Sequence, residues 1–333
     1  MNIRWGILGT GGIAAKFAES FRYAQGGELY AVASRSKEKA DQFARHHGIP
    51  HAFSSYQSLA DSQQVDAVYI ATPHPMHFEN AAMCLKEGNH VLCEKPVTMN
   101  AEQLEHLTDL AQQNGCFFME AIWSRFIPVF CRVNQWLHRE LNGEAEYLRA
   151  DFGIYKPFDP KSRLFDPHLG GGSLMDVGFY PVWLAIHTFD SEPESIHAEA
   201  KFTETGVDHF VSLTLTFPGD RKADLMCANQ LGTPTRAEIY GNGFRIEIDP
   251  QFHCPTRASL TQGDETSVFQ SGFDPHGYQF ETTEANRCIA ESLPESPHLP
   301  WNRSRQIIRT LDRIRQEIGL IYPDEVEQAD LNR

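Results

Sequence analysis

The sequence predicts an α/β protein of two domains, and three observations support this fold class. The chain has 333 residues, enough for two domains of roughly 100 to 200 residues each. Short apolar runs alternate with helical runs up to about residue 120, whereas later runs alternate apolar and polar side chains. We therefore expect a parallel-sheet domain over residues 1–121 and an α/β domain with a mainly antiparallel sheet over residues 122–333.

The first part of the chain predicts a parallel sheet that helices cover on both faces. The expected strands are short and continuously apolar, at residues 3–9, 29–34, 67–72, 90–93 and 117–120. The expected helices lie between them, at residues 13–24, 36–47, 77–87 and 101–114. Strands buried on both faces have this continuous apolar pattern because the crossover helices exclude water from each face.

The second part predicts a different architecture. Residues 128–141 are expected to form one helix, and residues 210–217 and 244–248 alternate apolar and polar side chains. The Gly241-Asn242-Gly243 turn predicts a hairpin, and the alternation is typical of antiparallel strands with one less buried face. Five residues near the end share one helical stripe: Ile307, Ile308, Leu311, Ile314 and Ile318. Residues 324–333 are polar, and we expect them to be loosely held.

Composition excludes several classes of protein. Apolar residues make up 41% of the chain, and no apolar run approaches the roughly 18 residues of a membrane span. The net charge of −15 argues against nucleic acid and anionic membranes as partners. The cysteines form no CxxC pair, and the N-terminus has no signal-peptide pattern. We therefore expect a cytoplasmic protein with reduced thiols.

The segment Gly9-Thr10-Gly11-Gly12-Ile13-Ala14 follows the first expected strand and opens the first expected helix. In that context its spacing is typical of a Rossmann dinucleotide-binding turn. Gly9 allows the tight turn, Gly11 lets the backbone approach a pyrophosphate, and Ala14 lets the helix pack closely on the sheet. The free amides at the helix start then meet the negative charge. The alternative is a tight turn that binds no ligand.

The end of the second expected strand indicates which dinucleotide binds. Enzymes that use NAD usually carry Asp or Glu here to bind the ribose 2′-hydroxyl. This sequence has Ser34, Arg35 and Ser36 instead, with Lys37 and Lys39 close by. Arg35 can pair with a 2′-phosphate, and the two serines can donate hydrogen bonds to it. We therefore expect NADP rather than NAD. The alternative is a solvated basic start to a helix.

Four motifs resemble, in order and spacing, those of the Gfo/Idh/MocA oxidoreductase family. The first is the glycine turn. The other three are Ala71-Thr72-Pro73-His74-Pro75-Met76-His77, which resembles A-T-P-x-x-x-H, Glu94-Lys95-Pro96, which resembles E-K-P, and the segment from Gly170 to Gly178, which resembles G-G-G-x-L-x-D-x-G. The resemblance covers both expected domains. It implies an N-terminal Rossmann domain, then a C-terminal α/β domain with a large, mainly antiparallel open sheet.

Two further segments resemble one branch of this family. They are residues 119–128, Met-Glu-Ala-Ile-Trp-Ser-Arg-Phe-Ile-Pro, and residues 319–323, Gly-Leu-Ile-Tyr-Pro. The branch contains dimeric trans-1,2-dihydrobenzene-1,2-diol dehydrogenases and NADP-linked D-xylose 1-dehydrogenases. The resemblance implies a homodimer through the C-terminal sheet and a cis Lys95–Pro96 peptide bond. We also expect cofactor contacts from residues within the family motifs: Thr72, Pro73, His77, Glu94, Lys95 and Pro96.

Lys95, Asp176 and Tyr180 are the expected catalytic residues. Lys95 follows a strand, at the sheet edge where ligands bind, and Asp176 and Tyr180 are four residues apart, so that on a helix they would share a face. Many family members carry His where Tyr180 stands. A tyrosine, with an ordinary pKa of about 10, moves protons near neutrality only if a cation stabilises its phenolate. We expect Tyr180 as proton shuttle, Lys95 as its electrostatic partner and Asp176 as orienting group; Lys95 as proton carrier and Tyr180 as a packing residue stay open.

Two other groups of residues are candidates for binding. His74 and His77 stand in an H-x-x-H spacing, but no further ligands cluster with them, so we expect no metal and expect His77 to bond locally. Residues 155–168 are rich in turn formers and aromatic rings, typical of a substrate loop or a plain connector. The residues expected near the substrate are Trp123, Arg125, Phe158 and His168.

These expectations combine into one reaction. We expect hydride transfer between NADP and a hydroxyl or hemiacetal carbon of a small polyol, either an aldose such as D-xylose or a trans-dihydrodiol. Two alternatives stay open. One is a non-catalytic NADP-binding regulatory protein, and the other is a relative that uses NAD transiently in glycoside cleavage.

Overall fold

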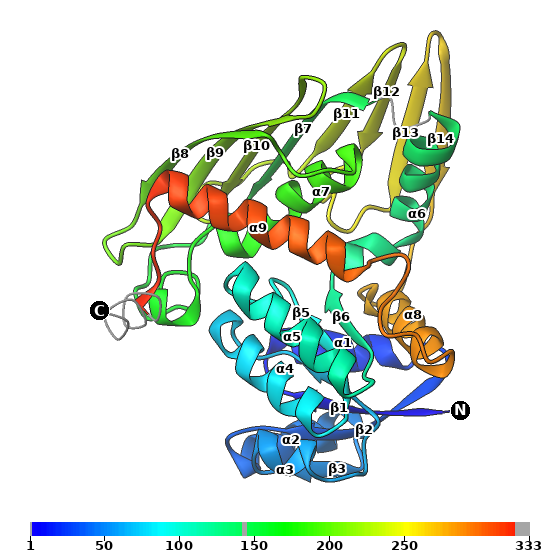
Figure 1. The fold of residues 1–333 in the computed structure, drawn as a ribbon, viewed down its shortest axis with the longest axis vertical. Coiled ribbons are helices and arrows are strands. Elements are labelled where there is room, and N and C mark those ends of the chain that lie inside the picture. The colour runs from blue at the N-terminus through cyan, green and yellow to red at the C-terminus, as the bar shows by residue number, and fades with distance from the viewer. Residues whose placement is uncertain (1, 142–144, 324–333) are drawn as a thin grey trace. The chain divides into compact units, whose positions relative to one another are not determined.

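The computed structural model describes residues 2–141 and 145–323, so the segment 324–333 that we expect to be loose lies outside the described residues. The chain divides into two compact units. The first unit comprises Met1–Phe126 and Phe273–Ser304, and the second comprises Ile127–Gly272 and Arg305–Arg333. A late segment of the chain, residues 273–304, therefore belongs with the N-terminal part (Figure 1).

The first unit is built on a six-stranded parallel sheet, which confirms the Rossmann prediction. The strand order is β3-β2-β1-β4-β5-β6. The strands are β1 (Ile3–Leu8), β2 (Gly27–Ala33), β3 (His51–Phe53), β4 (Ala67–Ile70), β5 (His90–Glu94) and β6 (Phe118–Ala121). The order reverses between β1 and β4, and in an open α/β sheet ligands bind at the carboxyl ends of the strands beside such a reversal.

Six α-helices belong to the described part of the first unit. They are α1 (Gly12–Phe21), α2 (Lys37–His47), α3 (Tyr56–Ala60), α4 (His77–Lys86), α5 (Ala101–Gln113) and α8 (Tyr278–Ala290). Local capping explains why two of them begin where they do. The Ser36 hydroxyl accepts the backbone N–H of Lys39 at the start of α2, and the Asn100 side chain accepts that of Gln103 at the start of α5. In Figure 1, α4 and α5 lie side by side, and α8 lies beside α1.

The second unit is built on an eight-stranded sheet in the order β14-β13-β12-β11-β7-β10-β9-β8. The strands are β7 (Ala145–Gly153), β8 (Ser195–Phe202), β9 (Asp208–Phe217), β10 (Arg221–Ala228), β11 (Ala237–Gly241), β12 (Phe244–Ile248), β13 (Arg257–Gln262) and β14 (Glu265–Gln270). β7 and β10 pair in parallel, and the other neighbouring strands pair antiparallel. The expected hairpin is confirmed, because β11 and β12 pair with Gly241 opposite Phe244.

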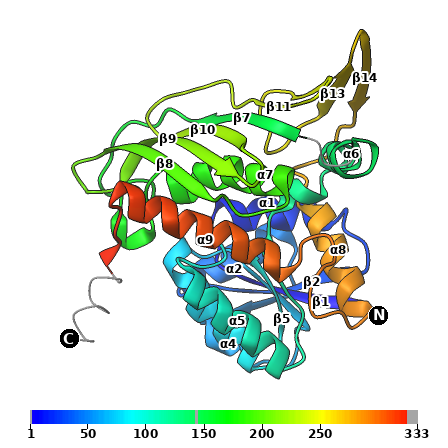
Figure 2. The ribbon, with the colours of Figure 1, turned by 45° about the horizontal axis from the view of Figure 1, so that its top comes forward.

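The two faces of this sheet differ in chemistry. One face carries buried apolar side chains, such as Leu213 and Leu215 of β9 and Ile246 of β12, and α7 (Phe179–Phe189) packs against it. Figure 2 shows α7 and the second-unit part of α9 (Trp301–Ile318) on the same side of the sheet. The opposite face carries polar side chains, so the strands have the alternating pattern that the sequence indicates.

The helices of the second unit depart from the sequence expectation in their winding. The helix expected over residues 128–141 begins as α6 (Pro128–Gln135) and continues as a π-helical turn, Trp136–Glu140. A second π-helical turn, Leu174–Gly178, runs directly into α7. Among the helices that the structure describes, none combines the length and the apolar character that a bilayer crossing requires.

Candidate active site

Three loops of the first unit meet at the carboxyl edge of its sheet. They follow β1, β4 and β5, which are neighbours in the sheet. The register places Leu8 of β1 opposite Ile70 of β4, and Ile70 opposite Cys93 of β5. The glycine turn, the segment after Ile70 and the Glu94-Lys95-Pro96 motif therefore begin at the same level of the sheet. The fold therefore brings three of the family motifs to the carboxyl edge of the six-stranded sheet.

The glycine turn has the geometry of an anion cradle. Gly9 has φ +107°, a left-handed conformation that favours glycine, and it lies close to the chain after β4. Gly11 caps the start of α1 without any side-chain hydrogen bond, and the first turn of α1 carries no acidic residue. A β carbon on Gly11 or Gly12 would meet no atom within 4 Å. Open space in front of uncapped helix amides fits a pyrophosphate.

The Ser34-Arg35-Ser36 segment lies between β2 and α2. Ser34 is buried, and its hydroxyl accepts the backbone N–H of Ser36 at 3.3 Å. The Ser36 hydroxyl accepts from Lys39 as the cap of α2, so its own hydrogen stays available to donate. Arg35 is exposed at the start of the helix, where a dianionic phosphate can reach it. Lys37, the neighbouring cation, forms an ion pair with Asp41.

His77 connects the loops that follow β4 and β5. Its Nδ1 lies 2.7 Å from the carbonyl oxygen of Pro96, and its Nε2 lies 2.8 Å from that of Thr72. Asn80, one turn along α4, donates to the Thr72 hydroxyl at 3.1 Å. The expectation that His77 bonds locally is therefore confirmed. The His77 side chain therefore holds Thr72 and the Lys95–Pro96 turn close to each other. The expected cis Lys95–Pro96 peptide bond is also confirmed.

The Glu94 carboxylate supports the turn that carries Lys95. One carboxylate oxygen accepts the hydroxyl of Tyr69, and the other accepts the backbone N–H of Lys95 at 3.2 Å. Burial, with the charge of Glu94 second, raises the pKa of Tyr69 well above its usual value, so Tyr69 remains a hydroxyl donor. The Lys95 side chain is 8% exposed, at the edge where the three loops meet.

Glu120 on β6 supports the same turn from the other side, and the sequence analysis did not single it out. Its carboxylate accepts the backbone N–H of Val97 at 3.0 Å and the hydroxyl of Ser304 at 2.6 Å. Burial raises the pKa of Glu120 to about 7, against hydrogen bonds from Ser304 and Val97 and the positive charge of Lys95, all of which lower it. Lys95 is thus close enough to Glu120 for its positive charge to act on this carboxyl.

Trp123 and Arg125, two of the expected substrate residues, lie in the short helical turn after β6. Both are largely buried. The Trp123 ring stacks on Tyr278 at the start of α8, with centroids 4.9 Å apart and planes 5° from parallel. Arg125 donates through Nε to the carbonyl oxygen of His298 at 3.1 Å. These contacts connect residues far apart in the chain, so no local pattern in the sequence could indicate them.

Asp176 and Tyr180 lie in the second unit, on two consecutive helical segments. Asp176 is in the π-helical turn Leu174–Gly178, whereas Tyr180 is in the first turn of α7. The helical segment that carries both residues therefore changes from π-helical to α-helical winding between them. Asp176 pairs with Arg163, whose guanidinium nitrogen is 3.1 Å from a carboxylate oxygen.

Tyr180 lies among aromatic rings of the second unit. Its ring centroid is 5.5 Å from that of Phe152, on β7, and 5.3 Å from that of His253, on the loop after β12. His253 in turn stacks on Phe152 at 4.5 Å. Sequence reasoning did not select Phe152 or His253, because they lie 28 positions before and 73 positions after Tyr180. Together the three rings form an aromatic wall on which a cyclic substrate can pack.

The loop over residues 155–168 is mostly exposed, and its two expected substrate residues lie in different surroundings. Phe158 packs edge to face on Phe165, with centroids 5.2 Å apart. His168 is exposed in a short helical turn that the Asp166 carboxylate caps through the backbone N–H of His168. No group of three or more His, Cys, Asp or Glu side chains suited to a metal ion occurs among the described residues.

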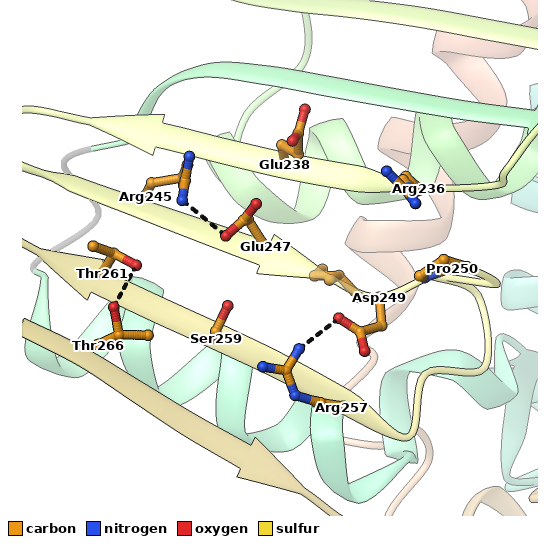
Figure 3. A pocket seen from close by; sticks show the side chains of 11 residues that line it. Arg236, Glu238, Arg245, Glu247, Asp249, Pro250, Arg257, Ser259, Thr261 and Thr266 are labelled. Atoms are coloured by element: carbon orange, nitrogen blue, oxygen red, sulfur yellow. Dashed lines mark hydrogen bonds and ion pairs between the residues drawn. The ribbon is translucent and has the colours of Figure 1, made fainter.

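A charged hollow of about 500 Å³ lies on the polar face of the eight-stranded sheet (Figure 3). Its lining alternates basic and acidic side chains from β11 to β13, including the ion pairs Arg245–Glu247 and Arg257–Asp249, each with a separation of 3.0 Å. It contains none of the expected catalytic residues. This hollow is therefore a feature of the sheet face and distinct from the motif residues described above.

Family comparisons agree with this geometry. Residues 3–122 match the model of an oxidoreductase family with an NAD-binding Rossmann fold, and residues 130–247 match that of the GFO/IDH/MocA C-terminal domain. The chain belongs to the Gfo/Idh/MocA oxidoreductase family. It is a dehydrogenase of the class that acts on hydroxyl groups, which confirms the enzyme class expected from the motifs.

Individual relatives cover the whole chain. The trans-1,2-dihydrobenzene-1,2-diol dehydrogenase of Xenopus laevis is 35% identical over 97% of this chain and 100% of its own length, and that of Danio rerio is 33% identical over 98% and 99%. Among solved structures, a 3-ketoreductase from Actinomadura kijaniata, in complex with NADP and TDP-benzene, has a TM-score of 0.85 at 23% identity, covering 96% of this chain and 98% of its own. An aldose-aldose oxidoreductase from Caulobacter crescentus, complexed with glycerol, has the same score, identity and coverage.

Proposed function

We propose that this protein is an NADP-dependent dehydrogenase that transfers a hydride between the nicotinamide and a hydroxyl or hemiacetal carbon of a small polyol. The observation that carries the proposal is the carboxyl edge of the six-stranded sheet. There, the uncapped start of α1 lies at the same level as the turn that carries Lys95. In this proposal residues 1–121 bind the cofactor, and residues 122–333 bind the substrate.

The adenine and phosphate half of the cofactor would be held by backbone and cations. Residues Gly9 to Ile13 would bind the pyrophosphate, and the open space around Gly11 supports this assignment. Arg35 and the hydroxyls of Ser34 and Ser36 would bind the 2′-phosphate, with Lys39 nearby. The absence of an acidic residue at the end of β2 favours NADP over NAD.

The nicotinamide half would contact the loops after β4 and β5. Thr72, Pro73, Glu94 and Pro96 belong to these loops, and the brace through His77 supports their fixed placement. The bound cofactor supplies the hydride chemistry. The protein's own task is then to orient the substrate carbon and move one proton.

We assign the transfer of that proton to Tyr180. Its hydroxyl would take the proton from the substrate hydroxyl during oxidation, and the Lys95 ammonium would stabilise the resulting phenolate. Asp176, held by Arg163, would orient the substrate through a hydrogen bond. Lys95 as the proton carrier is the alternative within the same site, and the Tyr180→Phe variant separates the two.

The substrate is proposed as a trans-dihydrodiol or an aldose. The full-length similarity to proteins named trans-1,2-dihydrobenzene-1,2-diol dehydrogenase supports the first, and both are cyclic polyols that can pack on the wall of Phe152, Tyr180 and His253. Trp123, Arg125, Phe158 and His168 are proposed as further substrate contacts. We also propose a cytoplasmic location, which the buried thiols of Cys84, Cys93, Cys116, Cys227 and Cys288 support.

The experiment that tests this function is a matrix of two cofactors against two substrate classes. Purified protein is mixed with NADP or NAD and with aldoses or trans-dihydrodiols, and reduced cofactor is followed by its absorbance. We expect turnover with NADP to exceed that with NAD for at least one substrate. Absence of any cofactor reduction across the matrix, with cofactor binding intact, would favour a regulatory role and overturn the proposal.

We propose further that the chain forms a homodimer through the polar face of its eight-stranded sheet. The alternation of basic and acidic side chains around the hollow in Figure 3 is self-complementary, as a twofold contact requires. Reversing two charges, Arg245→Glu with Arg257→Glu, should give a monomer by light scattering, whereas the wild type is a dimer. The control is Arg22→Glu at the end of α1, outside this face. A monomeric wild type would contradict the proposal.

A further inference from the structure

Asp208, the first residue of β9, holds the start of the helical segment that carries Asp176 and Tyr180. It is fully buried. One of its carboxylate oxygens, Oδ2, accepts three hydrogen bonds: from the backbone N–H of Ser173 at 2.9 Å, from the Ser173 hydroxyl at 2.6 Å and from the backbone N–H of Leu174 at 2.8 Å. All these groups belong to the second unit, so the arrangement is internal to it.

This arrangement acts as a helix cap supplied from another element. The π-helical turn Leu174–Gly178 has no side-chain cap from the residue before it. The first N–H groups of a helical segment have no partners within the helix, and a buried one left unpaired is costly. Asp208 supplies both an acceptor and a negative charge at the positive end of the segment. No local pattern in the sequence around Ser173 indicates this cap, because the carboxylate comes from 35 positions further along the chain.

Two glycines of the G-G-G-x-L-x-D-x-G segment lie where a β carbon would clash with a neighbouring side chain. Gly172 has φ +115°, and a β carbon there would lie 2.3 Å from the second oxygen of Asp208. A β carbon on Gly178, at the other end of the turn, would lie 2.7 Å from the Cys227 sulfur. The Ser173 hydroxyl also lies 3.5 Å from that sulfur. The segment is therefore fixed at both ends, by Asp208 and by Cys227 beneath it.

We infer that Asp208 is a positioning residue for the reaction: it holds the segment 173–180 in the one arrangement in which Asp176 and Tyr180 act together. The inference rests on the proposed roles of those two residues. Asp176 is two residues beyond the capped Leu174, and Tyr180 follows one further turn on. A loosened cap therefore displaces both groups at once. Misplacement of a catalytic group by about 1 Å can reduce turnover by roughly 100-fold.

The test compares Asp208→Asn and Asp208→Ala with a matched control. Asn keeps an acceptor oxygen and the side-chain size but loses the charge, whereas Ala leaves the three donors without this acceptor. Asp66→Asn is the control: Asp66, directly before β4 in the first unit, also accepts hydrogen bonds from a backbone N–H and a side chain, both of Arg4, but is only half-buried. For each variant we would measure Kd for NADPH, kcat per cofactor-binding site, KM, and hydrogen–deuterium exchange of the segment 173–180.

We expect Asp208→Asn to fold and to bind NADPH as the wild type does. Its kcat per cofactor-binding site should fall by about 10- to 100-fold, and exchange in the segment 173–180 should rise by about tenfold or more. Asp66→Asn should stay within about twofold of the wild type in kcat. If Asp208→Ala does not fold, Asp208→Asn alone decides the question.

Two outcomes would overturn the inference. One is a lower Tm in Asp208→Asn with kcat per binding site unchanged, which would make the residue merely structural. The other is unchanged exchange across the segment 173–180, and this readout needs no turnover. If the wild type itself reduces no cofactor, the proposed function fails, and the exchange experiment still tests whether Asp208 orders the segment.

Discussion

Gly9 lies so close to the carbonyl oxygen of Ala71 that a β carbon on the glycine would be 2.8 Å from that oxygen. The contact joins the residue after β1 to the residue after β4, across the point where the strand order of the parallel sheet reverses. A β carbon on Gly11, two residues further along the chain, would have no atom within 4 Å. One glycine is therefore required by the fold, and the other leaves space for a ligand.

This difference predicts opposite effects of two alanine substitutions. Gly9→Ala should lower the free energy of unfolding by about 1–3 kcal/mol, because it combines a left-handed φ with a backbone clash. Gly11→Ala should leave stability nearly unchanged and raise the Kd for NADPH at least about tenfold, because its methyl group occupies the pyrophosphate space. Thermal unfolding and fluorescence titration measure the two effects. Gly272→Ala, at another open position, is the control and should alter neither.

Arg35 is predicted to determine the choice between the two dinucleotides. Arg35→Ala should raise the Kd for NADPH by roughly 10- to 100-fold, because hydrogen bonds to charged groups contribute about 1.5–3 kcal/mol. The Kd for NADH should change by less than about threefold, since NADH lacks the 2′-phosphate. Arg45→Ala, in the last turn of the same helix, is the matched control. An equal loss for both cofactors would refute a 2′-phosphate site at Arg35.

The sequence could predict those parts of the fold and site that rest on local patterns. The glycine turn and the strands β1, β2, β4 and β5 all follow from short-range spacing and apolar runs. The short β3 was missed, because three residues carry too little pattern to distinguish a strand. The π-helical turn at Leu174–Gly178 was missed because residue spacing alone does not distinguish it from an α-helical turn, and its cap from Asp208 is a tertiary contact.

At the site too, the sequence could not predict contacts between residues that are far apart in the chain. Glu281 on α8 is fully buried, and neither of its carboxyl oxygens has a hydrogen-bond partner among the described residues. Burial, with the charge of Glu94 second, raises the pKa of Glu281 well above its usual value. A sequence pattern shows Glu281 only as a polar residue in a helix. Its proximity to the E-K-P motif comes from packing over 187 positions.

Glu120 predicts a pH dependence of stability. Its pKa in the folded protein is about 7, above the model-peptide value of 4.5, so the folded state holds the proton more tightly than the unfolded chain. Glu120 therefore contributes stability below pH 4.5 that is lost as pH rises towards 7. The difference of about 2.5 between these two pKa values corresponds to about 3.4 kcal/mol at most.

Urea unfolding of the wild type and Glu120→Gln between pH 4 and 8 measures this contribution. The free energy of unfolding of Glu120→Gln, relative to the wild type, should rise with pH across this window, because glutamine does not titrate. Glu199→Gln is the control, because the Glu199 side chain is 80% exposed. A difference between wild type and Glu120→Gln that stays flat with pH would show that Glu120 does not titrate in this range.

The most direct test of the central proposal is the turnover of Tyr180→Phe with NADP and the best substrate of the matrix. The account predicts that kcat falls by at least about 100-fold while the Kd for NADPH stays within about twofold, because only the proton-transferring hydroxyl is removed. Tyr23→Phe, at a tyrosine that is 52% exposed just after α1, should keep full turnover. Undiminished turnover in Tyr180→Phe would contradict the account and leave the proton to Lys95.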